Sequence, residues 1–314
     1  MVELKVFSSE RFVLLLPAGH RFPMAKYRRL RERVEAELDD VELIEPPPAA
    51  DSVIGLAHDA DYVERVVKGH LSASEQRTIG FPWSPQMVER SRRSVGATLS
   101  TCKAALSESI AVNLAGGTHH AMRDGGQGYC VFNDAAIATL ALQTEQPAGR
   151  RLRVAIVDLD VHQGNGTASI LAGNGASFTL SVHCESNFPS RKERSDLDIG
   201  LADGTTDREY LETLDRALDG MLARFAPDFI IYLAGADPYA GDRLGRLKLS
   251  LAGLARRDER VFDLARRLGV PIAVTMAGGY GHDLEQTVAA HFNTVRTACE
   301  SWRLRRGVSK EQPW

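Results

Sequence analysis

The chain has 314 residues, of which 44% are hydrophobic, and a net charge of −3 from 38 basic and 41 acidic side chains. This composition supports a large core in one or two domains and excludes the global basic field typical of nucleic-acid-binding proteins. Four cysteines without a CxxC pair favour free thiols in a reducing cytoplasm, and we expect a cytoplasmic protein. The apolar run 12–16 is too short to span a membrane, and the N-terminus lacks a secretory pattern.

The first half of the chain predicts short strands separated by helices and loops. Pro85 suits the first turn of a long helix, and a triple proline closes the second strand. The predicted elements are a strand or strand pair at 4–7 and 12–16, a loop at 17–23, a helix at 27–38, a strand at 41–44, a helix at 60–68, a loop at 78–85, a helix at 85–106 and a strand at 110–114.

The second half alternates apolar strands with amphipathic helices. The predicted elements are a glycine-rich loop at 116–134, a helix at 135–143, strands at 154–157 and 177–183, a long irregular loop at 184–206, a helix at 207–225, a strand at 228–233, a helix at 250–268, a strand at 271–276 and a helix at 283–303. Without any linker or composition break, this order predicts one α/β domain over 1–304, followed by a tail at 305–314. The expected architecture is an open, mostly parallel sheet with helices on both faces.

Polar side chains cluster where the predicted strands end, which is where ligands bind in open α/β sheets. Asp158, Asp160 and His162 follow a buried strand at alternate positions, so in an extended segment they share one face. Two carboxylates and an imidazole crowded together call for a cation. A solvated acidic turn is the alternative, and the recurrence of polar groups at other strand ends disfavours it.

The residue types at these ends suggest metal-dependent hydrolysis. Asp160, His162 and Asp237 would give a zinc ion two carboxylates and one imidazole, with one position left open. The adjacent His119 and His120 suit acid–base work on water, although such a pair on its own is more often ordinary surface or core histidines. Tyr280, after two glycines, could donate to an oxyanion, and packing is its common alternative role.

Five motifs occur in the chain, and their order together is far more specific than any one of them. They are GGTHHA (116–121), GYCVFND (128–134), DLDVHQGNG (158–166), AGADPYAGDRLG (234–245) and AGGY (277–280). Together they resemble the histone deacetylase family of zinc amidohydrolases, over roughly residues 15 to 300. The segments 187–211 and 250–262 most resemble the class IV branch and its bacterial relatives. The resemblance implies the arginase/deacetylase fold and one Zn²⁺ per chain.

The resemblance also implies roles for the residues around the metal. Tyr280 would polarise the acyl carbonyl together with zinc, and His120 would act first as base and then as acid to the leaving amine. His119 would give electrostatic support, with Asp158 as its hydrogen-bond partner, and Asn165 would be the partner of His120. A neutral amide stabilises an imidazolium less than a carboxylate does, so His120 is expected to titrate lower than His119.

Two further sets of residues follow from the resemblance. Gly128, Tyr129 and Phe188 match walls of an acyl-lysine tunnel, and Leu244 matches its rim. A structural K⁺ is expected from a second set, which comprises Asp158, Asp160, His162, Ser181 and Val182.

Two positions depart from the family pattern. The family often has an arginine that lines an internal channel. At this position the chain has Lys26 instead, as class IV relatives do. The loop 78–85 lacks the aspartate with which many deacetylases grip the substrate backbone. Cys130, expected below the tunnel floor, is interpreted as a packing residue.

The leading hypothesis is a zinc-dependent deacylase of acyl-lysine, acting on acetyl or longer fatty acyl groups. The expected partner is an acylated lysine or a small acylated amine, and neither nucleic acid nor membrane. An acetylpolyamine or small-amide amidohydrolase is the nearest alternative. An arginase-like ureohydrolase would need a second set of ligands, and a non-catalytic ligand sensor would usually lack a catalytic group.

Overall fold

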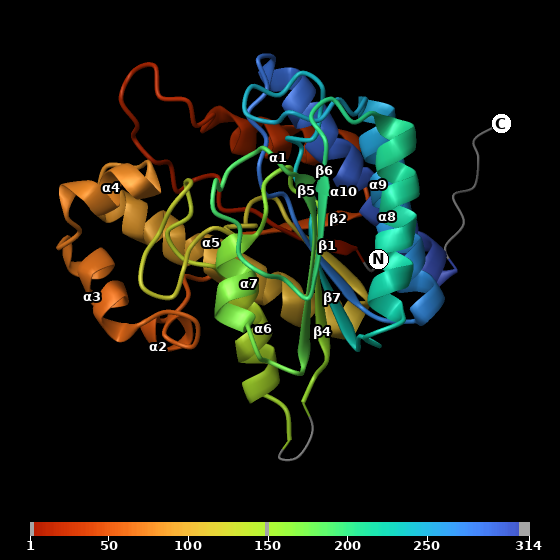
Figure 1. The fold of residues 1–314 in the computed structure, drawn as a ribbon, viewed down its shortest axis with the longest axis horizontal. Coiled ribbons are helices and arrows are strands. Elements are labelled where there is room, and N and C mark those ends of the chain that lie inside the picture. Colours follow the sequence, from red (N-terminus) through yellow and green to blue (C-terminus); the bar gives the residue numbers. More distant parts are fainter. Residues whose placement is uncertain (1–2, 148–150, 308–314) are drawn as a thin grey trace.

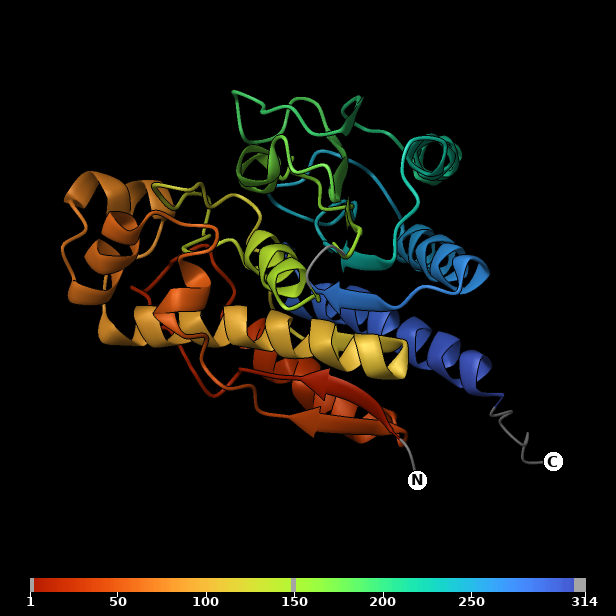
Figure 2. The ribbon, with the colours of Figure 1, turned by 90° about the horizontal axis from the view of Figure 1, so that it is seen from below.

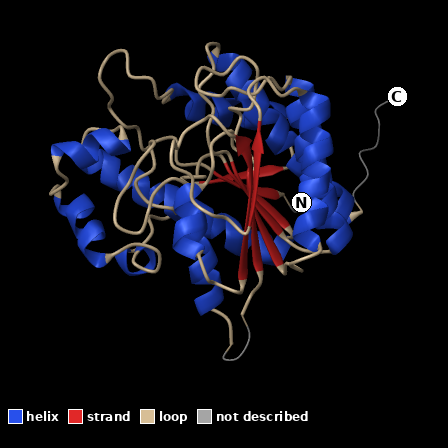
Figure 3. Cartoon of the chain, viewed as in Figure 1, coloured by secondary structure: helices blue, strands red, loops and turns tan. Residues whose placement is uncertain are grey.

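The computed structural model describes residues 3–147 and 151–307 and shows one parallel sheet across the middle of the molecule (Figures 1 and 3). In the described residues the strands lie in the order β2-β1-β3-β8-β7-β4-β5-β6, and every neighbouring pair is parallel. The strands are β1 (Leu4–Phe7), β2 (Val41–Ile44), β3 (Ile110–Asn113), β4 (Val154–Asp158), β5 (Ser177–Cys184), β6 (Leu197–Leu201), β7 (Phe229–Leu233) and β8 (Ile272–Thr275).

Helices cover both faces of this sheet (Figure 2). The helices are α1 (Ala25–Glu37), α2 (Asp51–Ile54), α3 (Ala60–Lys68), α4 (Ala73–Ile79), α5 (Pro85–Glu108), α6 (Asp134–Thr144), α7 (Asn165–Leu171), α8 (Asp207–Leu222), α9 (Leu251–Leu268) and α10 (Leu284–Arg306). Buried residues of α1, α8, α9 and α10 form one core cluster with the sheet, and those of α5, α6 and α7 form another. The α/β fold class predicted from the sequence is therefore confirmed.

The central strands are apolar on both sides because each face packs against helices. In β4, Ala155 and Val157 belong to one core cluster, whereas Val154 and Ile156 belong to the other. Such strands read as continuous apolar runs, which is why the sequence located them well.

Local signals fix several helix ends. Ser84 accepts a hydrogen bond from the backbone N–H of Met87 and caps α5, whose first residue is Pro85. Gly269 ends α9 in the left-handed conformation with φ of +67°.

The carboxyl edge of the sheet gathers the polar segments singled out in the sequence. The loops after β3, β4, β7 and β8 begin at neighbouring positions, because β4 pairs with β7, β7 with β8, and β8 with β3. In register, Asp158 at the end of β4 lies between Ser181 of β5 and Leu233 of β7. Parallel pairing therefore brings together residues that are up to about 160 positions apart in the chain.

Several predicted elements were wrong. Residues 12–16 form no strand: Leu14 is buried, while Val13 and Leu15 are 49% and 77% exposed. The segment 184–206 was expected to be irregular, but it contains β6, and α2, α4 and α7 were not expected. The last helix continues to Arg306, and residues 308–314 of the predicted tail lie outside the described residues. No described helix has the length and apolar character needed to cross a lipid bilayer.

Candidate active site

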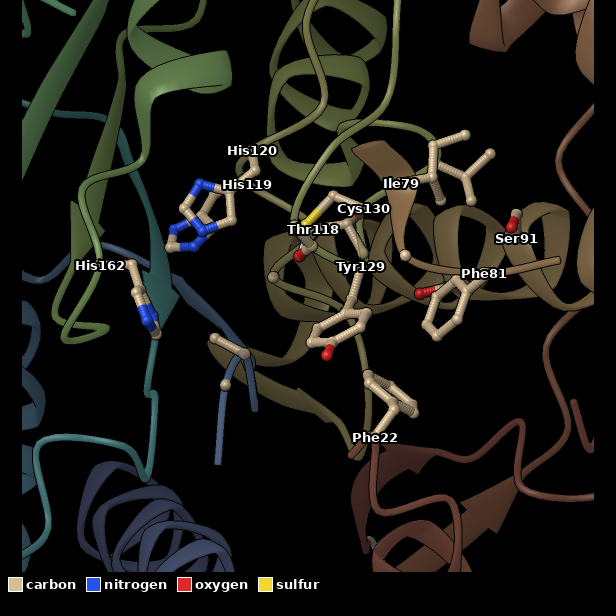
Figure 4. A pocket seen from close by; sticks show the side chains of 18 of the residues that line it. Phe22, Ile79, Phe81, Ser91, Thr118, His119, His120, Tyr129, Cys130 and His162 are labelled. Carbon is tan, nitrogen blue, oxygen red and sulfur yellow. Dashed lines mark hydrogen bonds between the residues drawn. The ribbon is translucent and has the colours of Figure 1, made fainter. Parts of the chain in front are cut away.

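A cavity of about 410 Å³ lies at the carboxyl edge of the sheet (Figure 4). Its walls come from the loops after β3, β4 and β8, the N-terminal loop and the first turns of α5. In Figure 4, His119, His120 and His162 lie on one side, and Ile79, Phe81 and Ser91 lie on the other. The predicted tunnel residues and the predicted catalytic residues His119, His120 and Tyr280 therefore line one cavity, whereas Asp158 and Asn165 do not line it.

Asp160 and His162 line one end of this cavity and converge there with Asp237, and all three residues are buried. His162 Nδ1 lies 2.9 Å from Asp160 Oδ1 and 3.3 Å from Asp237 Oδ2. One donor atom from each residue falls within 4.8 Å of the others. In the part of the chain that the structure describes, this is the one such group of three or more metal-binding side chains. A ureohydrolase with paired ions would need a second group.

The donor set fits a zinc ion. Asp237 Oδ2 is buried and has no hydrogen-bond partner among the described residues, so an oxygen lone pair is left for a cation. Burial and the charge of Asp160 raise the pKa of Asp237 to about 7, against the lowering effect of His162. A cation among these ligands would relieve this repulsion, and two carboxylates with one imidazole leave an open zinc position.

Backbone amides aim the two carboxylates. The N–H of Val161 donates to Asp237 Oδ1 at 2.9 Å, and the N–H of Gly278 donates to Asp160 Oδ2 at 2.7 Å. The other oxygen of each carboxylate lies near Nδ1 of His162. Gly235 lies so close that an added Cβ would be 2.8 Å from oxygens of both Asp160 and Asp237. The segments 158–162, 233–237 and 276–280 meet here without intervening side chains.

The two adjacent histidines have different partners. His119 Nδ1 donates to Asp158 Oδ2 at 2.7 Å, whereas His120 Nδ1 donates to Asn165 Oδ1 at 2.8 Å. Their ring centroids are 4.1 Å apart. Because Nδ1 of His120 carries the proton in this bond, its Nε2 is left unprotonated and can accept one.

These partners separate the two pKa values. Burial lowers the pKa of His119, but the charges of Asp158 and Asp160 outweigh it and raise the pKa to about 9. Burial and the charges of His119 and His162 hold the pKa of His120 well below its usual range, although Asn165 acts in the opposite direction. A cationic and a neutral imidazole thus stand side by side, in the direction expected from the sequence.

Tyr280 lies on a tight turn that follows β8. Its side chain is 8% exposed and lines the cavity together with Asp160 and His162. Its backbone N–H donates to Asp242 Oδ2 at 2.6 Å, and the turn places Ala277 at a φ of +52°. Burial, with the nearby charges of Asp160 and Asp237, raises the pKa of Tyr280 well above its usual value. The phenol therefore stays protonated and can donate a hydrogen bond.

Lys26 lies behind this turn. Its Nζ is 3.4 Å from the carbonyl oxygen of Ala277 and 3.3 Å from that of Gly279, and it lies 5.3 Å from the ring centroid of Tyr280. The lysine is 2% exposed. It therefore braces the turn that carries Tyr280.

The expected tunnel residues Gly128, Tyr129, Phe188 and Leu244 all line the cavity. Phe188 is 43% exposed and stands edge-on to His120, with ring centroids 4.8 Å apart. An added Cβ on Gly128 would lie 2.7 Å from the ring of His120, so glycine keeps this wall open.

Other predicted residues have simpler surroundings. Cys130 lines the cavity, and its Sγ lies 3.5 Å from the carbonyl oxygen of Gly128. Burial raises its pKa, so the thiol stays protonated. Ser181 Oγ pairs with His183 Nδ1 at 3.0 Å, and the expected K⁺ site, to which Val182 also belongs, stays a prediction.

One ion pair was missed as a part of this site. Arg257 and Asp258 are fully buried on α9, within a motif that had served only to suggest the class IV branch. Arg257 donates from one guanidinium nitrogen to the carbonyl oxygens of Gly235 at 2.6 Å and Leu159 at 3.3 Å. These carbonyls adjoin the segments that carry Asp160 and Asp237, the two carboxylates of the candidate metal site. Adjacent opposite charges on the apolar face of a predicted helix were the available signal.

Known proteins resemble this chain over most of its length. The histone deacetylase domain model matches residues 20–295. An uncharacterized protein of Picosynechococcus is 42% identical, with 91% of this chain and 95% of the relative covered. Histone deacetylase 2 of Arabidopsis thaliana is 30% identical over 86% of this chain and 72% of its own length. The acetoin utilization protein AcuC of Bacillus subtilis is 30% identical over 80% and 69%.

Solved structures share the fold at lower sequence identity. A histone deacetylase homologue complexed with SAHA aligns with a TM-score of 0.79 at 22% identity, covering 96% of this chain and 84% of the homologue. The HD domain of HDA15 aligns with a TM-score of 0.80 at 22% identity, covering 95% and 89%. Because the domain model spans most of the described chain, and relatives match along nearly its whole length, the chain belongs to the histone deacetylase family.

Proposed function

We propose that this protein is a zinc-dependent amidohydrolase that removes an acyl group from a lysine side chain or a similar small amine. The observation that carries the proposal is the convergence of Asp160, His162 and Asp237 at a cavity that is also lined by Tyr280 and by two histidines with different pKa values. The family of the chain supports the same reaction class.

The proposed metal site is formed by the two carboxylates and the imidazole. When bound, zinc supplies a Lewis acid for the acyl carbonyl and makes water more acidic. His120 accepts a proton from the attacking water at Nε2, because its Nδ1–H is engaged with Asn165 and burial keeps the ring neutral. The same ring later returns this proton to the departing amine.

Tyr280 and His119 stabilise charge in the reaction and transfer no proton. The protonated phenol of Tyr280 donates to the carbonyl oxygen as negative charge develops on it. His119, kept cationic by Asp158, adds a fixed positive charge next to the reacting carbon. We further propose a structural K⁺ near Asp158 and Ser181, as the resemblance implies.

The tunnel suits an acylated amine on a flexible apolar stem. Tyr129 and Phe188 present ring faces and edges to a methylene chain, while Gly128 leaves room beside His120. The cavity of about 410 Å³ extends from Asp160 and His162 to residues of α5 and has space for acyl groups longer than acetyl. Both acetyl-lysine and fatty acyl-lysine are therefore proposed substrates, with acetylpolyamines as the alternative.

A panel of fluorogenic lysine substrates tests the proposal. Acetyl to myristoyl substrates would be assayed with the protein loaded with zinc, cobalt or iron, and metal content would be measured on the same samples. We expect turnover with one transition ion per chain, and loss of both metal and turnover in Asp237→Ala. Two transition ions per chain, full zinc occupancy in Asp237→Ala, or no turnover with any acyl group would overturn the assignment.

A further inference from the structure

The far end of the cavity is polar and carries a positive charge. Arg90, Ser91 and Ser94 from the first turns of α5 line it, together with Leu14 and Tyr27. In Figure 4, Ser91 lies across the cavity from His162, beyond Tyr129 and Phe81. An acyl chain that starts at the metal end and follows the cavity would therefore end near these groups.

The charge of Arg90 has no carboxylate partner within 4.0 Å among the described residues, although the side chain is 9% exposed. Its guanidinium donates to the carbonyl oxygen of Phe12 at 3.2 Å and stacks over the ring of Tyr27, 4.4 Å from the centroid. No further hydrogen bond of this guanidinium occurs in the described chain, so most of its five N–H groups remain available.

Arg93, one turn later on the same helix, shows the usual arrangement. Its guanidinium pairs with Glu89 at 2.8 Å and donates to the carbonyl oxygen of Pro46 at 2.7 Å, outside the cavity. A buried cation is normally paired in this way, because an isolated charge in a poorly solvated place is costly. The unpaired charge of Arg90 beside a cavity thus points to an anionic ligand.

The energetics favour a carboxylate at the end of an apolar chain. The folded protein already bears the cost of burying the cation, so an incoming carboxylate adds only its own desolvation. Two charge-assisted hydrogen bonds from the guanidinium can offset the desolvation free energy of the carboxylate. The walls of the cavity also include the buried Val131, Phe132 and Met87, which suit methylene groups.

We propose that Arg90 is a specificity residue that binds the distal carboxylate of a dicarboxylic acyl group. Ser94 also lines this end of the cavity, whereas the hydroxyl of Ser91 donates to the carbonyl oxygen of Met87 at 2.7 Å. The favoured substrates are then amines acylated by a dicarboxylic acid through one of its two carboxyl groups. This inference rests on the proposed amidohydrolase function, and it adds the chemical class of the acyl group.

Matched substrate pairs test the inference on the unmodified protein. Each pair has acyl groups of equal length on the same lysine peptide, one ending in methyl and one in carboxylate: butyryl with succinyl, pentanoyl with glutaryl, and octanoyl with suberoyl. At the length that reaches Arg90, kcat/KM for the carboxylate member is expected to be about tenfold to a hundredfold higher, the range of a charge-assisted hydrogen bond. The difference should appear mainly in KM, because the contact is remote from the reacting carbon.

Two variants assign the effect to its residue. Arg90→Met keeps an unbranched apolar stem but removes the guanidinium, and it should remove the preference, whereas Arg90→Lys should keep part of it. Arg93→Met makes the same change on the same helix outside the cavity and should leave the preference intact. Circular dichroism of each variant checks folding, and the wild-type ratios stand even if Arg90→Met fails to fold.

Each outcome is decisive. A methyl-terminated member that is equal or better at every length overturns the inference while leaving the amidohydrolase function standing. A carboxylate preference that survives in folded Arg90→Met shows that another group reads the carboxylate, and also overturns it. Loss of turnover with every member of every pair would overturn the proposed function itself.

Discussion

Gly278 lies against both carboxylates of the metal cluster, so the substitution Gly278→Ala adds a methyl group where the ligands meet. The new Cβ would stand 1.9 Å from Asp237 Oδ2 and 2.6 Å from Asp160 Oδ2. The shortest ordinary contact at such a position is 3.4 Å, so the Asp237 carboxylate must move by about 1.5 Å. Metal–ligand distances tolerate only about 0.2 Å. The metal site should therefore lose one ligand.

The expected loss of zinc affinity is at least a hundredfold, which corresponds to about 3 kcal/mol. Dialysis against a competing chelator, followed by metal analysis, measures this affinity. The control is Gly175→Ala, since an added Cβ there meets no atom within 4 Å and the backbone has no left-handed φ. Normal zinc affinity and activity in Gly278→Ala would refute the ligand geometry. Urea unfolding of the two apoproteins, wild type and variant, measures any loss of stability from overpacking separately from the loss of zinc affinity.

Three further outcomes follow from the same geometry. Tyr280→Phe should retain zinc and lose about a hundredfold to a thousandfold in kcat, because only an oxyanion donor is removed; a nearly intact kcat contradicts this role. Asn165→Asp should raise the pKa of His120 and move the acid limb of the kcat/KM profile to higher pH, and an unmoved limb would count against the pairing. Burial lowers the pKa of His58 to about 4. Protonation of the unfolded chain should then reduce stability by about 3 kcal/mol as the pH falls from 6.5 to 4. Urea unfolding of His58→Gln should show a pH dependence weaker by that amount, and identical curves would exclude this linkage.

The sequence predicted the buried strands and the long helices because their apolar periodicity is strong. It missed β6, whose residues Leu197–Leu201 are mostly half-buried at the edge of the sheet and carry two polar or glycine positions. It also missed α4, although Ser72 and Glu75 form a capping box that was visible in the sequence. The apolar run 12–16 was wrongly predicted to be a strand. Its residue Leu14 lines the cavity instead.

The candidate site was predictable where side chains follow a strand directly, as for Asp160 and His162. The residues that tune the site were harder to find, since their partners lie far away in the chain. Arg257 contacts backbone carbonyls 98 and 22 positions away, and nothing in a single sequence indicates such contacts. Arg90 sits in a helix with several arginines, and only the structure distinguishes it from its paired neighbour Arg93.

The order of the strands has a consequence for how the protein is made. β8 leaves the ribosome last among the strands, yet it lies between β3 and β7 in the middle of the sheet. Until it emerges, the half-sheets β2-β1-β3 and β7-β4-β5-β6 have no strand to join them, and each presents an unpaired inner edge. A nascent or truncated chain that stops before Ile272 would expose two unpaired strand edges, which could pair with other polypeptides, and it would lack Tyr280. The three candidate ligands Asp160, His162 and Asp237 all precede β8, but the Gly278 N–H that holds Asp160 Oδ2 follows it, so the carboxylate gains this contact only after the last strand has been made.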